Sequence, residues 1–478
     1  MKLTNILGSS LLLVCCAFGG VACGGGDKPP PNTPSSGGKT GGAGPAAAEL
    51  SKDEQARFNA AVDLMVEHDK KADWNPETCA EVAKAFDAVG RSAQALFNAG
   101  LAYQRCNDDK NAKAKFEAAL QADAKFHHAR AQLALYQYKA DSNEDAAIGA
   151  LQQAVTDAQF QNVPALVNLA MVQMARDSAQ SGQGCKDDMD CAKLNLQRAL
   201  AIDDAFMPAF NQLALYYFSL AKKRAGAVKG TSKSSKGRQV VTSASFAKKA
   251  DVQQLELAAL VCSQAIRKNP SYAPIHNTAG LIQNELGQVN GAVAEFKQAA
   301  QLDPKFFEAQ MNYAAVNLGF RGFSEAEKAY KNALSMRPND YDAHLGLALA
   351  IRGPITGAEG DYDAKIAAVQ AELDAAKKID PNRPDAYYNE GIFTQEFKAK
   401  SGGAKEKTIA TLEEAKKIFQ TFLEKANGKP EYDGAVKRVK GDGTPKDAGR
   451  IGDIDDTIAF LKLDANAQKD QANQGTSQ

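Results

Sequence analysis

The chain has 478 residues, and its 57 basic residues are balanced by 57 acidic ones. This balance excludes a general electrostatic attraction to nucleic acid or to an anionic membrane, so we expect no nucleic-acid partner. A chain of this length usually divides into about three globular domains, unless it is built from repeats.

The N terminus has the pattern of an export signal. Lys2 precedes a largely apolar run, 6–18, that is too short to span a bilayer, and small residues then lead to Cys23. Residues 1–22 resemble a bacterial lipoprotein signal peptide. This resemblance implies that Cys23 becomes the lipid-modified first residue and, because Gly24 follows it, that the protein faces the periplasm from the outer membrane. The alternatives are an inner-membrane anchor and an ordinary secretory signal.

The next segment, 23–50, consists mainly of Gly, Pro, Ser, Thr and Ala. Such a composition cannot bury a core, so we predict a disordered tether. Flexible-chain scaling gives it a mean reach of roughly 25 to 30 Å. A helical pair with little repeat character is predicted over 51–92, and Ser51 and Glu54 have the spacing of a capping box at its start.

A small residue then recurs along the chain, and three of its seven spacings are 34 residues. A 34-residue period is typical of a helix-turn-helix solenoid. The longer spacings indicate that the same unit continues with insertions. The positions are Gly100, Ala134, Ala170, Ala214, Gly280, Ala314, Ala348 and Gly391.

Two units between residues 273 and 338 align without a gap. The small residue of the first helix lets the second helix approach closely, an aromatic residue fills the gap, and Pro suits the first turn of the next helix. The matched pairs are Gly280 with Ala314, Phe296 with Tyr330, and Pro304 with Pro338. This set resembles the tetratricopeptide repeat family. The resemblance implies an all-α fold, a right-handed superhelix of helical hairpins with about eight repeats over 93–426.

The longest spacing contains a basic insertion, 222–250, that has no acidic residue. Gly226, Gly230 and Gly237 predict a loop in its middle. This insertion either binds an anionic or acidic partner or is a solvated loop at a repeat edge.

Five cysteines follow Cys23, so they cannot all pair. Cys185 and Cys191 bracket a short acidic loop and are the first disulfide candidate, and Cys79 with Cys106, on adjacent helices, is the second. The remaining Cys262 occupies a core position of its repeat and is predicted to be buried.

We expect neither a metal nor a cofactor, and no enzymatic activity. The chain has no Cys-x-x-Cys, its five histidines are scattered, and no phosphate-binding loop, zinc-protease motif or nucleophile elbow occurs.

Asparagine recurs two or three residues before the small residue, although Asn is a poor helix former. In the family that the repeats resemble, the first helix lines a concave groove, where polar side chains hold the backbone or carboxylate of an extended peptide. The alternative is that these residues only bond neighbouring helices. The candidates are Asn98, Asn168, Asn211, Asn277, Asn312 and Asn389.

The repeats end near residue 426, and 427–478 is predicted to contain one capping helix, 451–463, followed by a disordered tail from residue 464. Ile454, Ile458 and Leu461 form an apolar stripe that can cover the last repeat.

Signal, tether and repeats together are similar to the layout of tetratricopeptide lipoproteins in envelope machines such as gliding-motility complexes. We therefore expect a scaffold that binds other envelope proteins through its groove. Two alternatives are a pilotin-like lipoprotein for secretin or pilus assembly and an activator of a cell-wall enzyme that acts on peptidoglycan or glycan.

Overall fold

The computed structural model describes residues 50–71, 73–179, 184–229, 249–358, 360–401, 404–444 and 447–475. The predicted signal peptide, Cys23, the tether up to residue 49 and residues 230–248 of the basic insertion lie outside the described residues. The chain divides into two compact units, with the boundary between Gly287 and Gln288. The sequence predicts one continuous solenoid, but a repeat array can divide between neighbours because each repeat contacts only the adjacent ones.

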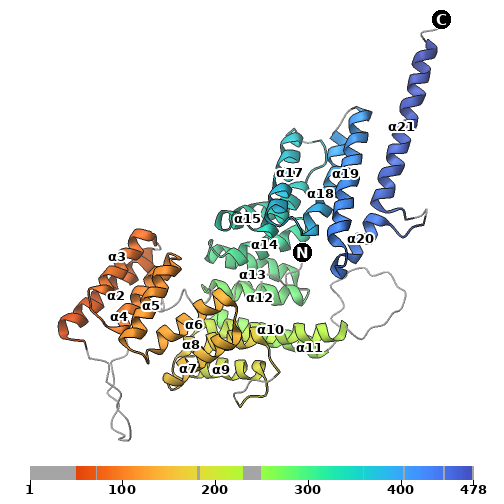
Figure 1. Ribbon diagram of the computed structural model, residues 1–478. Coiled ribbons are helices and arrows are strands. Elements are labelled where there is room, and N and C mark those ends of the chain that lie inside the picture. The colour runs from red at the N-terminus through yellow and green to blue at the C-terminus, as the bar shows by residue number, and fades with distance from the viewer. Residues whose placement is uncertain are drawn as a thin grey trace. The chain divides into compact units, whose positions relative to one another are not determined.

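The first unit is a series of helices in which each packs against the next, and α6, α8, α10 and α12 also contact one another in that order (Figure 1). This is the arrangement of stacked hairpins. The helices are α2 (Lys52–Lys71), α3 (Pro76–Asp87), α4 (Ala93–Arg105), α5 (Asp109–Ala122), α6 (His127–Asp141), α7 (Glu144–Asp157), α8 (Val163–Arg176), α9 (Asp188–Ile202), α10 (Met207–Lys229), α11 (Lys249–Lys268) and α12 (Ala273–Glu285).

The second unit repeats this pattern from α13 to α19, and α14 also contacts α16. Its α-helices are α13 (Val289–Leu302), α14 (Phe307–Gly319), α15 (Phe323–Met336), α16 (Tyr341–Arg352), α17 (Tyr362–Ile379), α18 (Pro384–Glu396), α19 (Lys405–Ala426), α20 (Asp433–Lys440) and α21 (Gly449–Gly475). Short 3₁₀ helices span Lys398–Ser401 and Pro430–Tyr432.

The described residues contain no β-strand, and their one isolated bridge joins Thr444 to Asp447. The fold is thus all-α, as predicted. Among these helices none has the length and apolar character needed to cross a membrane.

Two of the hairpins, α4–α5 and α18–α19, close through a contact between glycine and an aromatic ring. A Cβ added at Gly100 would lie 2.5 Å from Phe116 Cε1, and one added at Gly391 would lie 2.5 Å from Phe419 Cε1. Both rings are fully buried. Because any side chain at these glycines would collide with the ring, the structure confirms the predicted role of the small residue in helix one.

Five of the turns that end hairpins share one kind of hydrogen bond. An Asp or Asn side chain accepts from the backbone N–H two residues later, which forms an Asx turn and leads the chain into the next helix. The bonds join Asp123 to Lys125, Asp203 to Ala205, Asn269 to Ser271, Asp303 to Lys305 and Asp380 to Asn382.

The predicted capping box at the start of α2 is present. Ser51 N donates to Glu54 Oε2 at 2.8 Å, and Glu54 N donates to Ser51 Oγ at 3.3 Å. These bonds satisfy two backbone donors that the first turn of a helix leaves without intrahelical partners.

Two helices extend beyond their predicted ends. Helix α10 continues to Lys229, so Gly226 is helical and the basic insertion does not begin as a loop. Helix α21 continues to Gly475, through most of the segment predicted as a disordered tail. Both extensions are rich in Ala, Lys and Gln or Arg, whose helix propensity outweighs the roughly 1 kcal/mol that one Gly costs.

The C-terminal cap is built as its apolar stripe predicts. Ile454 is fully buried and Ile458 is 8% exposed, and both belong to a core that includes Leu412 and Phe419 of α19. A short helix that the sequence did not indicate, α20, contacts both α19 and α21.

Candidate functional site

A groove of about 630 Å³ opens on the first unit. It is lined by α2, α4, α6 and α8, which are the first helices of successive hairpins, and by the turns before α6 and α8. Its lining residues are Phe58, Gln94, Phe97, Asn98, Leu101, Asp123, Lys125, Phe126, His127, His128, Ala131, Gln132, Asn162, Pro164 and Asn168.

One wall of this groove is a cluster of aromatic rings. Phe97 and Phe126 meet edge to face with ring centroids 5.6 Å apart. The His128 ring lies 5.7 Å from Phe97 and 5.5 Å from Phe126. Rings in this arrangement form a firm apolar surface that can take another aromatic ring.

The two histidines of the groove are held in the neutral form. Burial and, to a smaller extent, the adjacent His127 lower the pKa of His128 to about 4. Burial also lowers the pKa of His127, against the opposing effect of Asp157 and Asp123. Near neutral pH the pair therefore adds no charge to the groove.

A hydrogen bond beside His127 supports this assignment. Asn162 caps α8, since its Oδ1 accepts from Ala165 N at 3.1 Å. Its amide nitrogen lies 2.8 Å from His127 Nδ1. Because the amide oxygen is already used by the cap, Asn162 Nδ2 donates and His127 Nδ1 accepts, which requires that this ring nitrogen carry no proton.

Asn168 stands out among the lining residues. It is 1% exposed, yet neither Oδ1 nor Nδ2 has a hydrogen-bond partner within the part of the chain that the structure describes. Five residues along the same helix, the equally buried Gln173 accepts from Asn195 at 3.0 Å. A buried polar group without a partner costs about 1 to 3 kcal/mol. Such a group calls for an explanation, and its place in a groove points to a ligand.

The six predicted asparagines have different roles. Asn98 lies in the same groove as Asn168, and its Nδ2 donates to Gln94 O at 2.8 Å. Asn211 accepts from Thr278 Oγ1 at 2.7 Å and so joins α10 to α12, as the packing alternative predicts. Asn389 donates to Asp385 O of its own helix at 2.9 Å.

The other two candidates, Asn277 and Asn312, are buried at 8% and 1% exposure. Of the six candidates, Asn98 and Asn168 line this groove. Sequence reasoning missed Phe97, Phe126 and the two histidines. The available signal was the aromatic run Phe126 to His128 at the turn before its helix.

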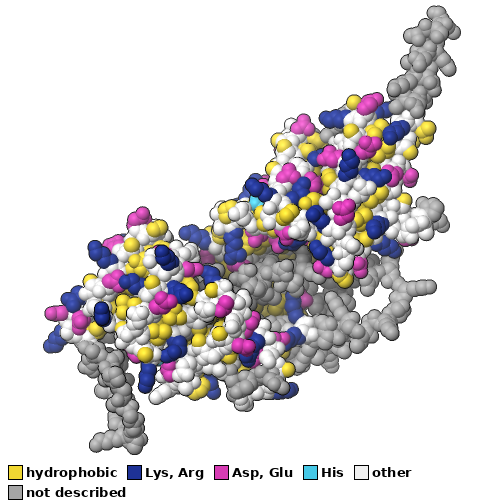
Figure 2. Space-filling model, in the orientation of Figure 1, with side chains coloured by type: hydrophobic (Ala, Val, Ile, Leu, Met, Phe, Trp, Pro, Cys, Tyr) yellow, Lys and Arg dark blue, Asp and Glu magenta, His cyan; other side chains and the backbone are white. Residues whose placement is uncertain are grey.

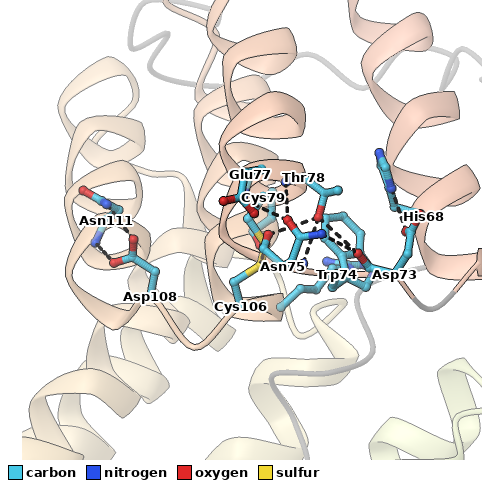
Figure 3. Close-up of a disulfide and its surroundings, with 12 residues drawn as sticks. His68, Asp73, Trp74, Asn75, Glu77, Thr78, Cys79, Cys106, Asp108 and Asn111 are labelled. Atoms are coloured by element: carbon cyan, nitrogen blue, oxygen red, sulfur yellow. Dashed lines mark hydrogen bonds and ion pairs between the residues drawn. A yellow bond between two sulfur atoms is a disulfide. The ribbon is translucent and has the colours of Figure 1, made fainter.

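Disulfides join both predicted cysteine pairs, Cys79 to Cys106 and Cys185 to Cys191. Cys262 is 2% exposed, as its core position predicts. The first bond ties α3 to the end of α4 (Figure 3). This bond fixes the N-terminal helical pair to the first repeat. Beside it, Asn75 caps α3 by accepting from Glu77 N and Thr78 N.

The second disulfide lies next to a buried ion pair. Asp188, which is fully buried, accepts from Arg176 Nη2 at 2.6 Å and from Ser178 N at 2.8 Å. Arg176 holds the pKa of Asp188 below its usual range although burial opposes this. These bonds hold together the start of α9, where Cys191 lies, and the segment that follows α8.

Two cations of the basic insertion have partners within the first unit. Lys223 pairs with Asp177, and Lys222 Nζ lies 4.0 Å from Glu285 Oε2. Figure 2 shows basic and acidic side chains interspersed on the visible face of the described residues. No group of three or more potential metal ligands occurs in the described ranges.

Two stretches of the chain, residues 93–126 and 273–306, match the family model of the tetratricopeptide repeat. The first stretch contains α4, α5 and the turn that carries Phe126, so much of the aromatic wall belongs to a recognised repeat. The fold is an all-α solenoid of the tetratricopeptide type. This fold class generally mediates protein–protein interaction and is generally non-enzymatic.

Several solved structures of such proteins are similar to part of this chain. A thermophilic tetratricopeptide repeat protein of Thermus thermophilus is 24% identical with a TM-score of 0.37, over 47% of this chain and 98% of that one. The pilF protein of Pseudomonas aeruginosa is 15% identical with a TM-score of 0.38, over 56% and 97%. YrrB, described as having an unusual peptide-binding site, is 14% identical with a TM-score of 0.31, over 50% and 97%. Among curated proteins there is no match.

Proposed function

We propose that this protein is a lipid-anchored scaffold of the bacterial cell envelope, and that it binds an extended segment of a partner protein in the groove of its first unit. The observation that carries the proposal is Asn168. Its amide is buried at the groove without a hydrogen-bond partner in the described chain. An extended polypeptide presents backbone donors and acceptors that can satisfy such an amide.

The compartment is supported by cysteine chemistry. Disulfides persist in oxidising compartments and are rare in the cytosol. Two disulfides on a chain whose N terminus resembles a lipoprotein signal favour export, with attachment to the outer membrane through lipid on Cys23. The layout of the sequence most resembles that of the lipoprotein in gliding-motility complexes. We propose that this protein acts in such a complex.

Site-specific photo-crosslinking in cells tests the groove. A photoreactive residue at Gln94, which is exposed and lines the groove, should form adducts with one or a few envelope proteins. The matched control is Gln153, which is exposed on α7 and does not line the groove. The same adducts from both positions, or none from Gln94, would contradict binding in the groove.

Counting thiols tests the compartment. Alkylation of the denatured protein from cells should modify only Cys262 if both disulfides form and Cys23 carries lipid, whereas a cytosolic protein would show at least five reactive thiols. A Cys23→Ala variant should appear in the soluble periplasm. Unchanged membrane fractionation of that variant would show that the anchor lies elsewhere.

A further inference from the structure

The charges at the groove restrict what can bind there. Among its lining residues only Asp123 and Lys125 carry formal charges near neutral pH, and they are of opposite sign. Asp123 Oδ1 is engaged by Lys125 N at 2.9 Å in the turn before α6. The described lining includes no guanidinium, so it lacks the fork of donors that holds a carboxylate in two-point geometry.

The apolar side of the groove favours an aromatic guest. The wall formed by Phe97, Phe126 and His128 has ring centroids within 5.7 Å of one another. Phe97 is half-buried, so part of its ring remains available. Neutral rings prefer to meet another ring at its edge or in offset, which an incoming Phe, Tyr or Trp can do.

The polar side of the groove consists of amides. Asn98 is half-buried and its Oδ1 is a ready acceptor, while Asn168 has both amide atoms without partners in the described chain. Asn168 is almost completely covered, so a ligand reaches it only when a neighbouring side chain of the lining moves. Amide side chains match the neutral N–H and C=O groups of a polypeptide backbone.

From these three observations we infer that the groove selects an uncharged, extended peptide segment with one aromatic side chain, and that it does not require a free C-terminal carboxylate. The aromatic side chain packs on the wall of Phe97 and Phe126. The peptide backbone bonds to Asn98 and Asn168. This inference rests on the proposed function and specifies its ligand.

The test uses full-length protein in detergent and a displayed library of random dodecapeptides. Selected peptides should share Phe, Tyr or Trp at one position and few charged residues around it. Synthetic versions are then compared by fluorescence anisotropy as C-terminal acids and amides. The two forms should bind within about twofold of each other, and replacement of the aromatic residue by Ala should weaken binding by about tenfold or more.

A matched pair of protein variants locates the binding. Phe97→Leu removes a ring from the wall and should weaken the selected peptides by about tenfold, whereas Phe160→Leu, which removes an exposed ring outside the groove, should leave binding unchanged. The comparisons among peptides need no variant, so they remain decisive if Phe97→Leu fails to fold.

Three results would overturn this inference: enrichment of acidic or basic residues in place of an aromatic one, loss of binding on amidation, or no selected peptide at all. Any of these, together with specific crosslinking from Gln94 in cells, would leave the scaffold function standing with a different ligand. If no adducts form from Gln94 in cells, the proposal that the groove binds a partner protein would itself be wrong.

Discussion

The hairpins α4–α5 and α18–α19 are built around the same contact, but the buried polar side chains in their surroundings have different roles. In each, a glycine of the first helix lies against a buried Phe ring of the second, Gly100 against Phe116 and Gly391 against Phe419. Beside Gly391, Oε1 of the buried Glu390 accepts from Lys377 Nζ and from Gln370 Nε2, both at 2.7 Å. At the groove of the first unit, the buried Asn168 has no partner in the described chain.

This difference separates charged groups that are paired within the fold from an amide at the groove that is available to a ligand. Around α18 the charges are paired within the unit, for example Arg383 Nη2 with Asp342 Oδ1 at 2.5 Å. Near α4, the lining of the groove consists of neutral rings and amides. The same backbone architecture therefore supports a closed ionic network in one place and a receptive surface in another.

The largest effect should come from breaking the ionic network. Lys377→Met keeps the aliphatic stem but leaves the Glu390 carboxylate, whose side chain is 6% exposed, without its cation. We expect a loss of about 2 to 4 kcal/mol in the free energy of unfolding, because an uncompensated buried charge is costly. Urea unfolding followed by circular dichroism measures this change.

The control for that experiment is Lys71→Met, which breaks an exposed pair with Glu67. Its urea midpoint should not move, because exposed pairs are screened by water. Equal behaviour of the two variants would mean that the network around α18 does not hold the fold.

The shared glycine contact predicts equal losses in the two hairpins. Gly100→Ala and Gly391→Ala each place a Cβ 2.5 Å from a Phe ring, so each should cost about 1 to 3 kcal/mol. Gly149→Ala, in α7, meets nothing within 4 Å and should be neutral or stabilising by up to about 1 kcal/mol. If Gly100→Ala behaves like Gly149→Ala in urea, the close packing of α4 on α5 is wrong.

A smaller effect is expected from the groove histidines as pH falls. The pKa of His128 is about 4 in the folded chain, below its ordinary value of 6.5. Between these values the unfolded chain binds more protons, so the stability contributed by neutral His128 is complete above about pH 6.5 and is lost as the pH falls towards 4.

His128→Gln removes this titration. The wild type should lose about 1 to 2 kcal/mol more than the variant between pH 7.5 and 4.5, after allowance for the partial exposure of the ring. Parallel pH profiles of unfolding for the two proteins would show that His128 is not held neutral by the fold.

Much of the fold could be predicted from local signals. Gly100, Gly391 and the 34-residue spacing reflect steric demands that any sequence must meet to pack two helices closely. The end of α21 could not be predicted, because polar residues such as Gln and Lys suit both a helix and a solvated tail.

The site was less predictable than the fold. Asn168 and Asn211 occupy similar positions before the small residue of their repeats, but one has no partner in the described chain and the other bonds Thr278, which lies 67 residues further along. Likewise Phe97 meets His128 only because two hairpins stack. Contacts of this kind, between residues on different helices, cannot be predicted from the local sequence.

The central claim is that Asn168 serves binding while Asn211 serves the fold, and one matched pair of variants tests it directly. Melting temperature and crosslinking from Gln94 are measured for Asn168→Ala and Asn211→Ala in the same experiment. Asn168→Ala should keep the wild-type melting temperature, since it removes a buried amide without partners in the described chain, but should lose the Gln94 adducts. Asn211→Ala should lower the melting temperature, because Thr278 loses its acceptor, and this corresponds to a loss of about 1 to 3 kcal/mol in the free energy of unfolding. This variant should retain the adducts. Retained adducts in Asn168→Ala, or a lower melting temperature in that variant alone, would contradict the account.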